Sequence, residues 1–184
     1  MMFGLFGKKD TGIRTNDQVW ISQRAKLQAA RKMVEANTGC LLVFWFEDSL
    51  REFHQLNAVS TESAQVVLAE SLSLESISGK LVIFGEHYPL RKKEQALFQK
   101  LQLTQVPVLV SLEEPFIHFF GGERTIELMH KMGMQESEVI SHAMITRSIE
   151  NAQKKMEEGV VTERKALSAQ EWLQLNAGSL NRTT

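Results

Sequence analysis

Apolar runs alternate with amphipathic stretches along most of the chain. Four runs are hydrophobic at nearly every position, which is typical of strands buried on both faces of a parallel sheet. They lie at 40–46, 66–69, 80–85 and 106–112. Helical periodicity fills much of the intervening sequence, and the predicted helices cover about 17–37, 48–57 and 90–103. This alternation predicts an α/β fold with a mostly parallel sheet flanked by helices.

The first helix is expected to begin at Asn16 or Asp17, because either side chain can accept hydrogen bonds from the free amides of a first turn. Its apolar stripe comprises Trp20, Leu27, Ala30 and Val34. Four basic residues are expected outside that stripe: Arg24, Lys26, Arg31 and Lys32. The second helix is expected to start near Asp48 and to bury Leu50, Phe53 and Leu56.

The C-terminal part of the chain predicts three further helices. One covers 115–134 with a break at Gly121-Gly122, and a short last one covers 169–176. The long helix predicted at 136–158 has one narrow apolar stripe, formed by Ile145, Ile149, Ala152 and Met156. An isolated helix of this length is marginal in water. Ile145, Ile149 and Met156 are therefore expected to contact the α/β body, a second copy of the chain or another protein partner.

These elements divide the chain into four parts. Residues 1–16 are expected to form a flexible tail, and residues 17–134 the α/β domain. The long helix occupies 135–159, and residues 160–184 form a linker, a short helix and a polar tail. At 184 residues the chain is long enough to bury the core of one compact domain.

Composition narrows the classes of partner. Lysine and arginine number 21 against 22 acidic residues, so the net charge of −1 gives no field that would recruit nucleic acid. The single cysteine, Cys40, cannot form an internal disulfide and is expected to be inert packing. No apolar run reaches the roughly 18 residues of a membrane span, and no secretory signal is recognised. A cytoplasmic protein is expected.

The N-terminal tail carries one candidate membrane-binding segment. Phe3, Leu5 and Phe6 directly precede Lys8 and Lys9. Apolar side chains can insert beside lipid headgroups, while each lysine adds about 1 kcal/mol on an anionic surface. These five residues predict a weak peripheral contact at the inner face of the cell membrane. The alternative is a frayed terminus that happens to contain apolar residues.

A search for catalytic chemistry is mostly negative. No stretch has the glycine spacing and Lys-Ser/Thr pair of a phosphate-binding loop. The five histidines are scattered without metal-ligand spacing. Glu113 and Glu114 with His118 imitate an acid/base pair, but exposed carboxylates at a strand end are more often solvated turn residues. No catalytic, cofactor-binding or metal-binding residue is therefore predicted, and no cofactor.

Several specific motifs between Pro107 and Glu157 do identify a family. They are Ser111-Leu112-Glu113-Glu114, Phe120-Gly121-Gly122-Glu123-Arg124, Leu128-Met129 with Met132-Gly133-Met134, and Ile145 to Lys155 (ITRSIENAQKK). Together they resemble SecA, the preprotein translocase motor ATPase, where its second nucleotide-binding domain enters the helical scaffold. The resemblance extends upstream through Lys80 to Lys93 and, more weakly, over Asp17 to Ala69. It implies a RecA-like α/β domain followed by a scaffold-like helix.

The same resemblance implies that the motor function is lost. Where the family has an arginine-rich loop that contacts ATP, this chain has Leu97 to Gln105, with Lys100 as its only cation. Lysine cannot supply the bidentate fork of arginine to phosphate oxygens. The family's first nucleotide-binding domain and most of its scaffold have no counterpart in this sequence.

The resulting prediction is a non-catalytic interaction module that is accessory to protein translocation. Its partner would be the translocase motor, the membrane channel or a second copy of the chain. The alternative is a domain that completes a nucleotide site in trans on a partner ATPase, through Arg91, Lys92, Lys93 or Lys100. A remnant that binds nucleic acid is a third hypothesis, and the sequence has no stripe of basic and aromatic residues to favour it.

Overall fold

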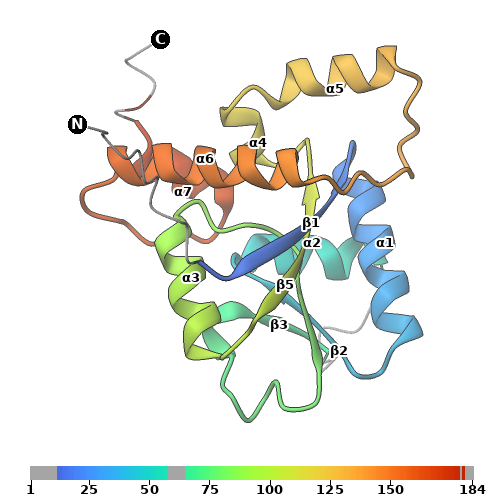
Figure 1. Cartoon of the computed structure of the whole chain (residues 1–184), viewed down its shortest axis with the longest axis vertical. Helices are drawn as coiled ribbons and strands as arrows, with labels where there is room; N and C mark the ends of the chain where they lie inside the picture. Colours follow the sequence, from blue (N-terminus) through green and yellow to red (C-terminus); the bar gives the residue numbers. More distant parts are fainter. Residues whose placement is uncertain (1–11, 58–64, 179, 181–184) are drawn as a thin grey trace, which may run out of the picture.

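The computed structural model describes residues 12–57, 65–178 and 180. Five strands form a single sheet in the order β1-β5-β4-β2-β3, and every pair is parallel. The strands are β1 (Arg14–Trp20), β2 (Cys40–Phe44), β3 (Val66–Leu68), β4 (Leu81–Phe84) and β5 (Gln105–Ser111). The predicted α/β fold with a parallel sheet is confirmed (Figure 1).

Seven α-helices and one 3-10 turn connect and cover the strands in the described part of the chain. They are α1 (Gln23–Ala36), α2 (Glu47–Asn57), η1 (Ala69–Ser71), α3 (Arg91–Lys100), α4 (Pro115–Phe119), α5 (Gly122–Lys131), α6 (Ala143–Gly159) and α7 (Ala169–Asn176). Among the described residues, no helix combines the length and the hydropathy needed to cross a membrane.

The sheet lies between two helical layers. Leu27 of α1 and Phe53 of α2 pack on one face, and Phe98 of α3, Met156 of α6 and Trp172 of α7 pack on the other. Strand β2 contributes alternate residues to the two cores, so all five of its residues are buried. This two-sided burial explains why the central strands are continuous apolar runs rather than alternating ones.

The start of the first helix was wrongly predicted. Asn16 and Asp17 do not cap a helix but lie within β1, which pairs with β5 along its whole length, and Trp20 is the last residue of that strand. Helix α1 starts only at Gln23, where the Ser22 hydroxyl accepts a hydrogen bond from the Ala25 amide at 3.2 Å. The polar sequence of β1 gave no sign of an edge strand. Its buried polar residue, Asp17, is hydrogen-bonded to His87.

Two helices also differ from their predicted form. Helix α6 begins at Ala143 rather than near residue 136, because Ile140 forms an antiparallel bridge to Val19 through two 2.9 Å backbone hydrogen bonds. In α2, Phe53 is buried as predicted, but Leu56 is about half exposed. The break between α4 and α5 is confirmed, since Gly121 adopts a φ of 92° that other residues rarely adopt.

Candidate functional site

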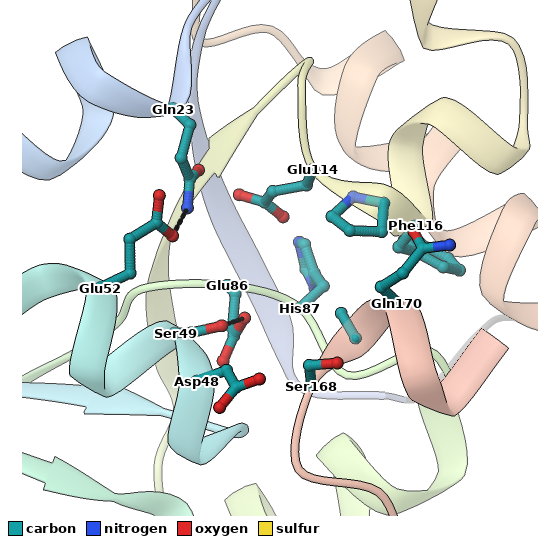
Figure 2. A pocket seen from close by; sticks show the side chains of 12 residues that line it. Gln23, Asp48, Ser49, Glu52, Glu86, His87, Glu114, Phe116, Ser168 and Gln170 are labelled. Carbon is teal, nitrogen blue, oxygen red and sulfur yellow. Dashed lines mark hydrogen bonds between the residues drawn. The ribbon is translucent and has the colours of Figure 1, made fainter. Parts of the chain in front are cut away.

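A cavity of about 290 Å³ lies at the carboxyl edge of the sheet. Its walls come from the segments that follow β1, β2, β4 and β5, together with the start of α7 (Figure 2). The lining residues are Gln23, Asp48, Ser49, Glu52, Glu86, His87, Glu114, Pro115, Phe116, Ser168, Ala169 and Gln170. Proteins with open parallel sheets bind their ligands at this edge, so the cavity is the candidate site.

One lining residue, Glu114, belongs to a buried ion pair. The Lys26 ammonium lies 2.7 Å from a Glu114 carboxylate oxygen and donates to the Gly85 carbonyl at 2.8 Å. Lys26 is 1% exposed and Glu114 is 7% exposed. Both were expected at the surface, and this expectation was wrong because each supplies the partner that makes the burial of the other tolerable.

Glu86 is the second buried carboxylate of the cavity. It accepts hydrogen bonds from the Trp45 amide at 2.8 Å, the Phe46 amide at 3.0 Å and the Ser49 hydroxyl at 2.6 Å. Burial raises the pKa of Glu86 to about 7, while the charge of Lys26 opposes that rise. Glu86 therefore titrates near neutral pH, the property required of a general acid or base.

Glu113 follows β5, and its carboxylate lies at the start of α1. Its carboxylate accepts a hydrogen bond from the Gln23 amide at 2.7 Å, and the Gln23 side chain donates to Glu52 at 2.9 Å. A free helix N-terminus attracts phosphate and other anions. At this edge of the sheet, the chain places its own carboxylates, Glu86 and Glu113, on backbone amides that an anionic ligand would use.

His87, which also lines the cavity, lies between two buried carboxylates. Its Nδ1 is 2.9 Å from Glu94 and its Nε2 is 3.1 Å from Asp17. Burial lowers the pKa of His87, but the two carboxylates outweigh it and raise that pKa well above its usual value. Gln153 of α6 donates to Glu94 at 2.7 Å and to the Tyr88 carbonyl at 2.8 Å. This network ties α6 to the sheet.

Glu113, Glu114 and His118, whose pattern imitates an acid/base pair, do not form one. Glu113 is exposed and Glu114 is bound to Lys26, whereas His118 has its Nδ1 3.6 Å from Glu123. Cys40 is buried, and burial raises the pKa of its thiol. Within the described ranges, no group of three or more His, Cys, Asp or Glu side chains is arranged to hold a metal ion.

An apolar groove of about 590 Å³ forms a second concavity, between α4, α5 and α6. Its sixteen lining residues carry no charged side chain, and they include Leu128, Met144, Ile145 and Ile149. Ile149 and Met156 are buried in the core and Ile145 packs against it, so the stripe of α6 lies on the α/β body. The role of these three residues in partner binding remains a prediction.

The predicted membrane residues, Phe3, Leu5, Phe6, Lys8 and Lys9, lie outside the described residues. Sequence reasoning also missed the residues that define the cavity. Glu86 and His87 directly follow a buried strand, where ligand-binding side chains of α/β proteins are commonly found. That position was the one signal that could have identified them. Lys26 gave none, because a lysine on an amphipathic helix is usually exposed.

No model of a known protein family matches the chain. Individual curated proteins do match. The protein translocase subunit SecA of Chlorobium phaeobacteroides is 53% identical over 98 residues, which cover 51% of this chain and 10% of that protein. SecA of Pelodictyon phaeoclathratiforme is 33% identical over 124 residues, 63% of this chain and 12% of the relative. SecA of Flavobacterium psychrophilum is 52% identical over 58 residues, 32% of this chain and 5% of that protein.

This chain contains a SecA-family region. The resemblance inferred from the motifs is thereby confirmed over about half of the sequence. The chain spans only 5 to 12% of the length of these SecA relatives. The activity and partners of a complete SecA therefore do not transfer to this chain by similarity.

Proposed function

We propose that this chain is a non-catalytic, SecA-related module that binds a protein of the translocation machinery at the cytoplasmic face of the membrane. Similarity to SecA supports a role in protein translocation. The observation that carries the non-catalytic part is the carboxyl edge of the sheet, where Glu86 and Glu113 already occupy backbone amides. An ATPase needs donors and cations at such a place for the phosphates of its nucleotide.

The charge of the cavity supports the same proposal. Four carboxylates line it, from Asp48, Glu52, Glu86 and Glu114, and no lysine or arginine does so in the described part of the chain. Lys26 and Glu114 neutralise one another, which leaves Asp48, Glu52 and Glu86 as the acidic groups that an anionic ligand would meet. Like charges a few ångströms apart repel strongly in a partly buried site, so a triphosphate would be disfavoured.

The alternative, a nucleotide site completed in trans, finds less support. Arg91 lies 3.3 Å from Glu150, and Lys93 lies 2.5 Å from Glu163, so both cations are bound within the chain. Lys100 ends α3, about 13 Å from Arg91 at 1.5 Å per helical residue. These cations do not converge on one phosphate group, and we retain the binding module as the proposed function.

The apolar groove is the surface that we assign to the translocase partner. It has no charge to pair, so its occupant is an uncharged apolar segment of that partner. Leu128 and Met144 line the groove and are 53% and 71% exposed, leaving a large apolar area for contact. Methionine side chains adapt to irregular apolar surfaces. Of the predicted stripe, Ile145 and Ile149 line this groove, whereas Met156 lies in the core beneath it.

Co-purification with the SecA motor and the membrane channel of the same cells tests the binding proposal. Met144→Asp should abolish capture, because it places a charge in the groove. Met132→Asp is the matched control, since Met132 is 72% exposed but does not line the groove. Capture of neither protein, or equal capture by both variants, would contradict the proposal. A change in mass with no translocase capture would instead indicate a second copy of the chain in the groove.

Calorimetric titration with magnesium and ATP tests the non-catalytic part. The purified chain should give no binding heat at micromolar concentrations and no phosphate release. The variant Glu86→Gln/Glu113→Gln should remain unable to bind ATP, because it still lacks the cations of a phosphate site. Micromolar affinity that Arg91→Gln or Lys100→Gln removes would favour the trans alternative.

A further inference from the structure

A polar pocket of about 400 Å³ lies between β1 and the start of α6. These two elements contact one another. Strand β1 is the last strand of the sheet, and its outer side is bridged at Val19 by Ile140. The pocket occupies the space beside the rest of that edge. Its lining residues are Arg14, Thr15, Asn16, Ser141, His142, Ala143, Thr146, Arg147 and Glu150.

Two arginines from distant parts of the sequence line this pocket. Arg14 and Arg147 are exposed, and neither forms an ion pair with a carboxylate of the described residues. The pocket has one carboxylate, Glu150, which already lies 3.3 Å from Arg91. The remaining charge is therefore positive, the opposite of the acidic cavity at the carboxyl edge. Paired arginines are the usual means of binding planar or tetrahedral oxyanions.

The other lining groups add one neutral donor, from His142. Three hydroxyls of the lining are already engaged within the chain, since Thr15 donates to Asp17 at 3.5 Å, Ser141 donates to Asn16 at 3.2 Å, and Thr146 is hydrogen-bonded to Asp17. The His142 Nδ1 accepts a hydrogen bond from the Met144 amide at 3.2 Å, so its Nε2 carries the ring proton and can donate. Helix α6 has no acidic residue in its first turn, which leaves its positive end without a carboxylate of its own.

We propose that this pocket binds a phosphate group, held by the guanidinium groups of Arg14 and Arg147 with a further hydrogen bond from the His142 ring. The shared chemistry is a phosphate oxyanion, which either a small phosphorylated solute or an anionic lipid headgroup can supply. This site is separate from the apolar groove, because none of its lining residues belongs to that groove. Its failure would leave the proposed partner binding untouched.

Amide NMR spectra of the full chain, titrated with inorganic phosphate at constant chloride, test the site directly. Phosphate should shift the amide signals of Ala143 to Thr146 and of Thr15. Arg14→Gln and Arg147→Gln should each weaken binding roughly tenfold, because each removes charge-assisted hydrogen bonds. Arg124→Gln is the matched control, since Arg124 is an exposed arginine on α5 that does not line the pocket. All three arginines are exposed, so the fold should survive each change.

Flotation with vesicles distinguishes the two sources. Phosphatidylglycerol vesicles should retain wild type more than the Arg14→Gln/Arg147→Gln variant if the ligand is a lipid headgroup, and phosphatidylcholine vesicles should retain neither. Phosphate shifts without this difference assign the pocket to a soluble phosphate compound. The proposal is overturned if phosphate moves no pocket amide and the vesicles retain both forms equally. Phosphate shifts that persist in the double variant would also overturn it.

Discussion

Lys26 and Glu114 form an ion pair of 2.7 Å between residues 88 positions apart in the chain. The pair joins the first turn of α1 to the turn that follows β5, and both side chains are nearly inaccessible to solvent. Because Glu114 also accepts a hydrogen bond from the Ser111 amide at 2.8 Å, one carboxylate fixes both the helix and the end of β5. This contact holds Glu114 in the lining of the acidic cavity.

Lys26→Met should therefore destabilise the fold. The substitution leaves the Glu114 carboxylate buried without a cation, and breaking a buried pair in this way typically costs about 3 kcal/mol or more. Urea denaturation at pH 7 measures the loss. Lys26→Met/Glu114→Gln should recover part of it, since the unpaired charge is gone.

The matched control is Arg51→Met, which removes an ion pair of 2.9 Å with Asp48 whose two side chains are 59% and 48% exposed. Surface pairs of this kind contribute less than about 1 kcal/mol. Equal losses from Lys26→Met and Arg51→Met would contradict the structural role assigned to Lys26.

Much of the fold could be predicted from the sequence. The central strands are continuous apolar runs because both of their faces are buried, and α7 has the predicted bounds because Ser168 caps its first turn at 3.0 Å. Strand β1 could not be predicted, since its first half is polar. Its position depends on pairing with β5, from which it is separated by most of the domain.

The candidate site was harder to predict than the fold. Lysine and glutamate on predicted helices and turns are usually exposed, so the pattern gave no sign that Lys26 and Glu114 would be enclosed together. The Asp17, His87 and Glu94 cluster likewise comes from three separate elements. Contacts between such distant side chains depend on the tertiary arrangement and not on local periodicity.

Glu86 should make stability depend on pH between about 4.5 and 7. Its pKa in the folded chain, about 7, lies above the ordinary value of 4.5. The protonated form is therefore favoured by folding, and the resulting stability is present below pH 4.5 and lost as the pH rises to 7. Glu86→Gln should remove this decline, which amounts to at most about 3 kcal/mol. Carboxyl NMR titration gives the midpoint directly, and a midpoint near 4.5 would refute the assignment.

Ile149→Asp should lower the melting temperature by many degrees, because Ile149 is 5% exposed and packs in the core beneath α6. A buried unpaired charge destabilises a domain severely. Val161→Asp is the control, since Val161 is 97% exposed and should tolerate the same substitution. Thermal denaturation followed by circular dichroism compares the two. An unchanged melting temperature in Ile149→Asp would mean that α6 does not pack on the body in solution.

Residues Phe3, Leu5, Phe6, Lys8 and Lys9 should give weak, salt-sensitive attachment to anionic membranes. Three apolar side chains and two lysines resemble a single reversible anchor, and even a full myristoyl chain binds with only about 10⁴ M⁻¹. Full-length protein should therefore co-sediment with anionic vesicles more than a version lacking 1–9 does. The difference should shrink in high salt, because the lysine charges are screened.

The pocket of Arg14 and Arg147 remains present in the shortened protein, so its contribution cancels in this comparison. Neutral vesicles should retain both forms equally poorly, because the lysines then have no anionic surface to meet.

Stable attachment needs a second contact, and a membrane-bound translocase partner in the apolar groove would provide it. Adding membranes that contain the channel should therefore increase retention of wild type more than that of Met144→Asp. Equal sedimentation of the full-length and shortened forms on anionic vesicles would show that the tail does not contribute to membrane binding.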